Sequence, residues 1–242
     1  MKGVVLAGGL GTRLAPMTTV VNKHVLDLFD EPMIHFPVRT LAQAGVTDLV
    51  VVVGRHGDQI RELLGDGANL GVSIAYAHQE GEAGIADALA QARDLVGGGP
   101  LVVILGDQVY QDDLSTYIDT FRRKPVGARI LLKQVEDARR FGVASVAGDR
   151  VSAIAEKPAE PASDLAVTGC YMYDGRVFDI VAGLEPSERG ELEITDVNNA
   201  YIAAGEMAFD VLPGWWADAG THASKLKASI LVALTRGVTF HA

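Results

Sequence analysis

The chain has 242 residues, 48% of them hydrophobic, which is enough to bury the core of one large domain or two small ones. Its formal net charge of −10 argues against nucleic acid or an anionic membrane as a partner. One cysteine, Cys170, excludes an intramolecular disulfide framework, and no run of 18 apolar residues occurs. We therefore predict a soluble, cytoplasmic protein.

Four short apolar runs in the first half of the chain have the composition of buried parallel strands. They occupy residues 4–6, 48–54, 73–79 and 101–105. Between them, residues 34–44, 58–64 and 84–96 have helical periodicity, and we expect Asp58 to cap the second of these helices. Strands that alternate with helices predict an α/β fold whose parallel sheet is covered on both faces.

The second half of the chain mixes strands and helices less regularly. We expect helices over residues 114–123, 193–204 and 221–234, and strands over 130–135, 166–173 and 208–212. Residues 143–146 and 151–155 form a predicted hairpin that turns at Gly148 and Asp149. In the last helix, Leu226, Ile230 and Leu234 share one face. No Pro- or Ser-rich linker divides the sequence, so we expect one continuous domain.

The segment after the first strand has the composition of a phosphate-binding loop. Three glycines leave backbone N–H groups open to an anion, a threonine adds a hydroxyl, and arginine and lysine add charge. These residues are Gly8, Gly9, Gly11, Thr12, Arg13 and Lys23, the last of which could fold back over the loop. The pattern is not a P-loop, because the chain has no Gly-Lys-Ser/Thr, and Leu14 replaces the third glycine of a dinucleotide fingerprint. A merely structural turn remains the alternative.

Two more polar residues follow predicted strands: Gln79 follows the third strand and Asp107 the fourth. The carboxyl ends of parallel strands meet at one edge of a sheet, where such sheets bind ligands. We therefore expect both side chains beside the glycine loop. A carboxylate there can hold a metal ion that bridges phosphates, although Asp107 could instead cap the next helix. Gln79 offers a donor and an acceptor that suit a pyrimidine base, or it is simply a polar strand end.

Several strings together resemble the sugar-1-phosphate nucleotidyltransferases, and most closely their glucose-1-phosphate thymidylyltransferase branch. They are LAGGLGTRL at residues 6–14 with Pro16 and Lys23 behind it, EKP at 156–158, AVTG at 166–169, RGELEITD at 189–196 and WADAGT at 216–221. The resemblance implies a three-layer α/β/α Rossmann-like fold with a mixed, mainly parallel sheet and a small sugar-binding hairpin. It further implies a single domain over residues 1–242, with a nucleotide-binding half at 1–110 and a sugar-binding half at 111–242.

The resemblance also implies a role for each candidate site residue. It assigns the triphosphate to the glycine loop with Arg13, Lys23 and Asp107, the base to Gln79 and Gly84, and a Mg²⁺ ion to Asp107 and Asp218. The sugar phosphate is assigned to Gln108, Gly142, Glu156, Lys157 and Val167. The residues implied to act most directly in catalysis are Arg13, Lys23, Asp107 and Lys157. Without the resemblance, Glu156 and Lys157 would be interpreted as a solvated ion pair.

The chain departs from the family pattern at a few positions near these motifs. Gln108 stands where the family has asparagine, Asp87 where it has glutamine, and Ala219 where threonine is usual. Gln108 matters most, because the family asparagine contacts the sugar or its phosphate. The sequence also resembles a short form without the extra C-terminal helices of longer members, so we expect no second, allosteric nucleotide site.

The reaction implied by the resemblance joins dTTP and glucose 1-phosphate to give dTDP-glucose and pyrophosphate, by Mg²⁺-dependent in-line attack on the α-phosphorus. UTP or another sugar 1-phosphate is the nearest alternative. A non-catalytic nucleotide-sugar sensor is another, although the retained cations and carboxylates argue against it. A dinucleotide-dependent dehydrogenase would need an acidic residue after the second strand, which ends instead on Gly54 and Arg55. We also expect a homo-oligomer.

Overall fold

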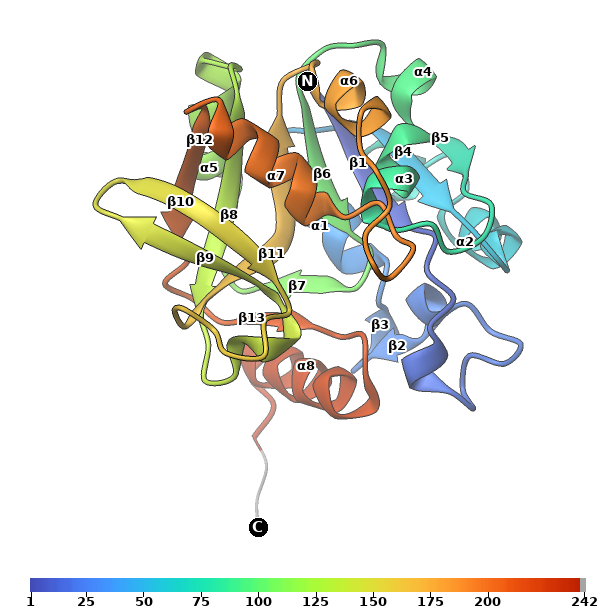
Figure 1. Cartoon of the computed structure of the whole chain (residues 1–242). Coiled ribbons are helices and arrows are strands. Elements are labelled where there is room, and N and C mark those ends of the chain that lie inside the picture. The colour runs from blue at the N-terminus through green and yellow to red at the C-terminus, as the bar shows by residue number, and fades with distance from the viewer. Residues whose placement is uncertain (240–242) are drawn as a thin grey trace.

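The computed structural model describes residues 1–239, and its centre is one nine-stranded sheet (Figure 1). The nine strands are β1 (Lys2–Ala7), β4 (Asp48–Val53), β5 (Ser73–His78), β6 (Leu101–Leu105), β8 (Ala128–Gln134), β9 (Gly142–Ala147), β10 (Arg150–Glu156), β11 (Leu165–Tyr173) and β12 (Met207–Val211). Their order is β10-β9-β11-β6-β1-β4-β5, while β8 pairs with both β11 and β12. Strands from both halves of the sequence therefore share one sheet.

The sheet is parallel where the apolar runs of the first half meet and mostly antiparallel beyond them, where β12 alone pairs in parallel, with β8. β1 pairs in parallel with β4 and β6, and β4 pairs in parallel with β5. β11 then runs antiparallel to β6, β8 and β9, and β9 and β10 form the predicted hairpin. The expectation of a mixed, mainly parallel sheet is confirmed. Because β1, β5 and β6 run in the same direction, the residues that follow them emerge at one edge.

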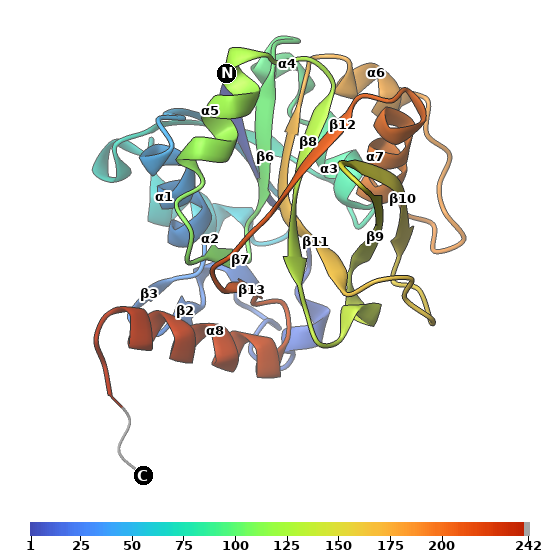
Figure 2. The ribbon, with the colours of Figure 1, turned by 90° about the vertical axis from the view of Figure 1, so that its left-hand side faces the viewer.

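Helices cover both faces of this sheet, as its two-sided burial requires. They are α1 (His35–Gln43), α2 (Gly57–Leu64), α3 (Ile85–Ala90), α4 (Arg93–Val96), α5 (Ser115–Arg123), α6 (Val177–Ala182) and α7 (Ile194–Ala203). Alternate residues of β1 face opposite cores: Val4 belongs to the core that includes residues of α3, α6 and α7, and Val5 to the core that includes residues of α1, α2 and α5. Figure 2 shows α1 and α5 on one side of the sheet and α6 and α7 on the other. The three-layer α/β/α prediction is confirmed.

A small additional layer closes the lower end of the molecule. β7 (Gln108–Tyr110) pairs antiparallel with β13 (Trp216–Asp218), and β2 (Asp27–Leu28) pairs with β3 (Glu31–Pro32). The last helix, α8 (His222–Thr235), packs on these short strands (Figure 2). The β7–β13 pairing sets Asp218 opposite Gln108, next to the end of β6. A carboxylate from near the end of the chain thus reaches the edge where the parallel strands terminate.

Three local predictions were wrong. The helix expected over residues 84–96 is divided into α3 and α4 by a break at Gln91 and Ala92. Asp58 does not cap α2, because the helix starts one residue earlier and His56 occupies the N-cap position. In α8 the buried residues are Ala228, Val232 and Ala233, whereas the predicted apolar face of Leu226, Ile230 and Leu234 is exposed. Over residues 1–239, none of the helices has the length and apolar character needed to span a membrane.

Candidate active site

One cavity of about 630 Å³ lies at the edge where β1, β5 and β6 end, a volume suited to a small-molecule ligand. Every candidate residue named from the sequence lines it. They are Gly8, Gly9, Gly11, Thr12, Arg13, Lys23, Gln79, Gly84, Asp107, Gln108, Gly142, Glu156, Lys157, Val167 and Asp218. The predicted convergence of the glycine loop, Gln79 and Asp107 is therefore present. Their individual roles stay predictions.

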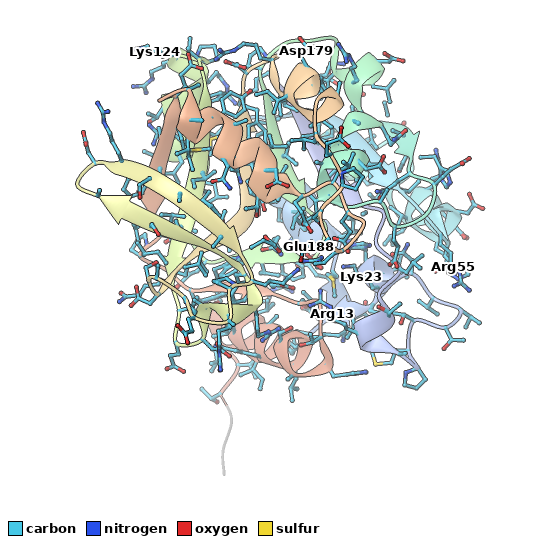
Figure 3. The ribbon with its side chains drawn as sticks, viewed as in Figure 1. Arg13, Lys23, Arg55, Lys124, Asp179 and Glu188 are labelled. Atoms are coloured by element: carbon cyan, nitrogen blue, oxygen red, sulfur yellow. The ribbon has the colours of Figure 1, made fainter. Side chains whose placement is uncertain are left out.

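The glycine loop depends on the small size of its residues. A Cβ on Gly8 would lie 2.2 Å from Oε1 of Gln79, so a larger residue would collide with that side chain. Gly11 has a φ of 70°, a left-handed conformation that side chains disfavour. A Cβ on Gly9 would lie 3.7 Å from Nζ of Lys23, which shows that this lysine does fold back over the loop. Figure 3 shows Arg13 and Lys23 in the lower part of the molecule, with Lys124 and Asp179 at the opposite end.

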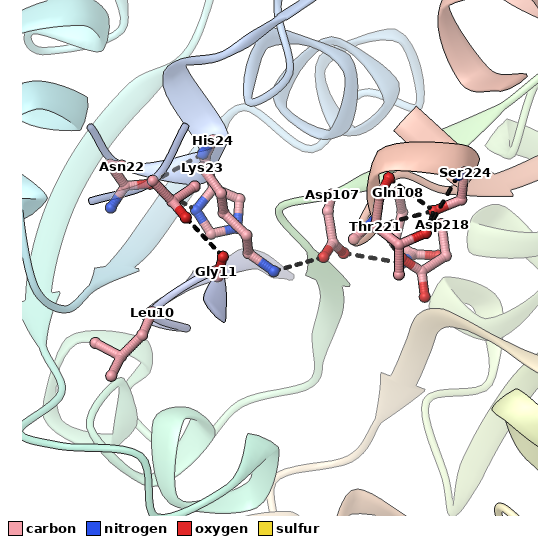
Figure 4. A network of polar contacts seen from close by, with 12 residues as sticks. Leu10, Gly11, Asn22, Lys23, His24, Asp107, Gln108, Asp218, Thr221 and Ser224 are labelled. Carbon is pink, nitrogen blue, oxygen red and sulfur yellow. Dashed lines mark hydrogen bonds and ion pairs between the residues drawn. The ribbon is translucent and has the colours of Figure 1, made fainter. Parts of the chain in front are cut away.

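Lys23 forms a buried ion pair with Asp107 (Figure 4). Its Nζ lies 2.6 Å from Oδ2 of Asp107, and the two side chains keep only 12% and 9% of their surface exposed. Burial alone would raise the pKa of Asp107, but the positive charge of Lys23 and the hydrogen bonds from Lys23 and Gln108 together outweigh it, and the pKa lies well below its usual range. Asp107 is therefore an anion at neutral pH, and it does not cap a helix.

The neighbouring His24 is a structural residue. It is buried, and both its backbone N–H and its Nδ1 lie 2.9 Å from Oδ1 of Asn22. Burial, reinforced by the charge of Lys23, lowers the pKa of His24 to about 3. Its ring is neutral at pH 7, so it adds no positive charge to the cavity.

Asp218 and Asp107 face one small space beside Gly220. A Cβ on Gly220 would lie 2.8 Å from Oδ1 of Asp218, 3.4 Å from Oδ2 of Asp107 and 3.1 Å from Nη2 of Arg13. Burial and the nearby charge of Asp107 raise the pKa of Asp218. The described residues contain no group of three or more His, Cys, Asp or Glu side chains arranged for a metal. Two carboxylates nevertheless fit Mg²⁺, which usually takes one or two protein carboxylates together with waters and substrate phosphates.

Gln108 connects the two carboxylate-bearing segments. Its Nε2 donates to Oδ1 of Asp107 at 2.9 Å, and its Oε1 accepts from Nε1 of Trp216 at 2.7 Å and from the N–H of Gly169 at 3.3 Å. The side chain is buried and lines the cavity, but both ends of its amide are engaged within the protein. Gln108 thus fixes the orientation of Asp107 and ties β7 to β13 and β11.

The other end of the cavity carries Gln79 and Gly84. Gln79 is buried, and its Nε2 donates to the carbonyl of Gly84 at 3.0 Å and to Oδ2 of Asp87 at 2.8 Å. Gly84 has a φ of 104°, and a Cβ there would lie 2.4 Å from the carbonyl oxygen of Leu192. Only glycine fits this close approach. It joins this end of the cavity to the segment that precedes α7.

The hairpin end of the cavity is built around Glu156. Its Oε2 accepts from Oγ1 of Thr195 at 2.6 Å, while its Oε1 lies 3.0 Å from Nζ of Lys157 and 3.6 Å from Nη1 of Arg189. Lys157 is exposed and has a φ of 42°, which turns the chain sharply after β10. Sequence reasoning gave no role to Arg189 or Thr195, although both line the cavity. The RGELEITD string was the signal that could have identified them.

The chain belongs to the nucleotidyl transferase family, because the sequence model of that family matches residues 2–233. Two similar relatives carry a more particular name, glucose-1-phosphate thymidylyltransferase. The one from Xanthomonas campestris pv. campestris strain B100 is 44% identical over 94% of this chain and 79% of its own length. The one from Neisseria meningitidis serogroup A is 38% identical over 98% of this chain and 84% of its own length. The resemblance stated from the motifs is confirmed.

Solved structures agree with this assignment. A Bacillus anthracis protein, described as a glucose-1-phosphate thymidylyltransferase in complex with sucrose, superimposes with a TM-score of 0.91. It is 45% identical, and the match covers 100% of this chain and 98% of that chain. A UDP-glucose pyrophosphorylase complexed with UDP-glucose superimposes with a TM-score of 0.86 at 23% identity, covering 97% of this chain and 99% of that one. The second similarity shows a common fold.

Proposed function

We propose that this nucleotidyltransferase joins dTTP and glucose 1-phosphate to give dTDP-glucose and pyrophosphate. The observation that carries the proposal is the set of residues that line the one cavity at the strand ends. It brings together a glycine loop with Lys23, two carboxylates beside Gly220, and the Glu156–Lys157 pair. Relatives of this name, 38% and 44% identical, support the choice of substrates.

The protein's own contribution to the reaction is positioning and charge neutralisation, because in-line phosphoryl chemistry needs no covalent enzyme intermediate. Arg13 and Lys23 stabilise the negative charge that develops on the departing pyrophosphate. Lys157, with Arg189 beside it, holds the phosphate of the attacking sugar. Asp107 and Asp218 would hold Mg²⁺, which when bound neutralises phosphate charge. Gln108 keeps Asp107 in place through its hydrogen bond.

Specificity comes from the two ends of the cavity. At the nucleotide end, Gln79 binds the base, and Gly84, which has no side chain, lets the base lie against its backbone. At the sugar end, Glu156 offers carboxylate oxygens to sugar hydroxyl groups, and Gly142 and Val167 shape the wall. A single domain thus divides the work between a nucleotide-binding half at residues 1–110 and a sugar-binding half at residues 111–242.

The nearest alternative is the same chemistry with UTP or with another sugar 1-phosphate. A sensor that binds nucleotide sugars without turnover is a weaker alternative, since it would not need a buried Lys23–Asp107 pair and a second carboxylate at one site. Cytoplasmic localisation and assembly of identical subunits belong to the same proposal, and sedimentation of the purified protein would test the assembly.

A pyrophosphate-release screen tests the substrate assignment. The purified protein would be incubated with Mg²⁺ and each pairing of dTTP, UTP, CTP, ATP and GTP with several hexose 1-phosphates, and each product identified by mass. We expect the highest kcat/KM for dTTP with glucose 1-phosphate, and lower but measurable rates with UTP. A higher kcat/KM for CTP or GTP than for dTTP would show the base assignment to be wrong.

A further inference from the structure

The amide of Gln79 can adopt only one orientation in this structure. Its Nε2 faces the carbonyl oxygen of Gly84 at 3.0 Å and Oδ2 of Asp87 at 2.8 Å. A backbone carbonyl and a carboxylate both accept hydrogen bonds and donate none, so only the NH₂ end of the amide can satisfy them. Turning the amide over would set its oxygen against two acceptors. Both N–H bonds of Gln79 are therefore used within the protein.

The remaining atom, Oε1 of Gln79, is turned toward the glycine loop. It would lie 2.2 Å from a Cβ on Gly8, so it occupies the space that the missing side chain leaves at the cavity wall. Both Gly8 and Gln79 line the cavity. Gln79 thus presents an acceptor and no free donor to a ligand. The sequence suggested that this amide would use both its donor and its acceptor on a base, and the contact with Asp87 removes the donor.

Asp87 is itself held in place. While Oδ2 accepts from Gln79, its Oδ1 lies 3.4 Å from Nε2 of Gln91, one turn further along. Gln91 also donates to the backbone carbonyl of Asp87 at 3.4 Å. The carboxylate is therefore restrained from its far side and directed at Gln79. Aspartate at position 87 strengthens this arrangement, since it can only accept, whereas a glutamine or asparagine there could donate as well as accept.

We propose that Asp87 is a positioning residue that makes Gln79 an acceptor-only reader of the nucleobase. The site then selects bases with a ring N–H at the position that meets Oε1, as thymine and uracil have at N3. Cytosine carries an unprotonated ring nitrogen there, so two acceptors would face each other and cytosine nucleotides are rejected. This inference rests on the proposed function and deepens it: Asp87, which does not line the cavity, sets the base selectivity of the site through Gln79.

Asp87→Asn tests the idea with little change in shape. Asparagine can turn its NH₂ toward Gln79, which leaves the carbonyl of Gly84 as the one remaining acceptor that opposes a turned-over amide. A turned-over amide would offer a donor to cytosine. We expect the ratio of kcat/KM for dTTP to that for dCTP to fall at least about tenfold, as expected when a site loses one selective hydrogen bond. The kcat with saturating dTTP should change less than about threefold, because Asp87 acts on base binding alone. Asp87→Glu, which keeps an acceptor-only group, should retain more of the selectivity.

A double-mutant cycle distinguishes positioning from a general structural effect. If Asp87 acts through Gln79, then Asp87→Asn should leave the dTTP-to-dCTP ratio unchanged in a Gln79→Ala background. Asp94→Asn, which removes an exposed carboxylate from neighbouring α4, is the matched control and should leave the ratio as in the wild type. The same ratios should be measured as dissociation constants for dTTP and dCTP by calorimetry, which needs no turnover.

The outcomes separate this inference from the proposed function. A wild-type protein that binds dTTP more tightly than dCTP, and loses that preference only when Asp87 changes and Gln79 is present, supports the inference. An unchanged ratio in a folded Asp87→Asn protein overturns it, as does the same loss of selectivity in the Gln79→Ala background. If binding follows the expected pattern but no pairing of substrates releases pyrophosphate, the proposed function fails and the base-reading inference stands.

Discussion

The ammonium of Lys23 lies 2.6 Å from a carboxylate oxygen of Asp107, although 84 residues separate the two in the chain. Both side chains are largely buried, so neither charge is well solvated and each depends on the other. The pair joins the segment after the glycine loop to the end of β6. It also places a cation and an anion of the candidate active site in direct contact.

Removing Lys23 alone should therefore be more damaging than removing both partners. Lys23→Met leaves a buried, unpaired carboxylate, and we expect it to lower the free energy of unfolding by about 3 to 5 kcal/mol. The double variant Lys23→Met/Asp107→Asn should recover most of that loss while remaining inactive. Urea unfolding at pH 7 measures the stabilities. A Lys23→Met protein as stable as the wild type would show that the buried carboxylate of Asp107 does not depend on Lys23.

The two carboxylates beside Gly220 should both be essential for turnover, and Asp218 should not be needed for folding. We expect Asp107→Asn and Asp218→Asn each to lower kcat at least about a hundredfold. A bound metal ion stabilises negative charge in the transition state, and each variant would lose that stabilisation. Asp218→Asn should not lower the melting temperature, because it removes a carboxylate whose pKa is raised by burial and by its like-charged neighbour. Titration with Mn²⁺ gives a second readout, since each variant should bind it more weakly. Near-normal turnover of both variants in Mg²⁺ would rule out the assignment.

Gln108 should act through Asp107 and Trp216 and not by contacting sugar. Gln108→Asn is too short to keep its contacts with Asp107, Gly169 and Trp216 together, and a lost buried hydrogen bond costs about 1 to 3 kcal/mol. We expect lower stability and a lower kcat with an unchanged KM for glucose 1-phosphate. A selective rise in that KM, with stability and kcat retained, would indicate direct sugar contact instead.

Asp174, far from the cavity in the fold, should control acid stability. Its carboxylate accepts from the N–H of Gly127 at 2.7 Å, from the guanidinium of Arg176 at 2.6 Å and from the hydroxyl of Tyr201 at 2.9 Å. Burial alone would raise the pKa of Asp174, but these donors outweigh it and the pKa is lowered. A lowered folded-state pKa means that the stabilisation is complete above about pH 4, the unfolded value, and is lost as pH falls through the folded value.

The measurement compares Asp174→Asn with the wild type by urea unfolding between pH 7 and pH 3. We expect the variant to be less stable by about 1 to 3 kcal/mol at pH 7, with the difference shrinking below about pH 4. Asp149→Asn, in the exposed turn of the β9–β10 hairpin, is the control and should follow the wild type. A difference that persists unchanged at pH 3 would contradict this assignment.

Most of the fold was predictable because its parallel strands are short apolar runs and most of its helices have clear periodicity. The convergence of the glycine loop, Gln79 and Asp107 followed from parallel topology alone. The β7–β13 pairing did not, because three-residue strands carry no periodic pattern, and it is this pairing that places Asp218. The buried face of α8 was also predicted wrongly, because this helix packs on the same short strands. Small Ala228 packs closely on them, while the larger Leu226 and Ile230 are exposed to solvent. The loss of the Gln79 donor to Asp87 depends on a contact between side chains that their spacing in the chain does not reveal.

The most direct test of the proposed reaction is a stoichiometric assay with both substrates. The protein would be incubated with dTTP, glucose 1-phosphate and Mg²⁺, and the products followed by phosphorus NMR. We expect dTDP-glucose and pyrophosphate in equal amounts, formed only when both substrates are present and abolished by Asp107→Asn. Release of pyrophosphate or phosphate from dTTP without the sugar phosphate, or no dTDP-glucose from the wild-type protein with both substrates, would contradict it.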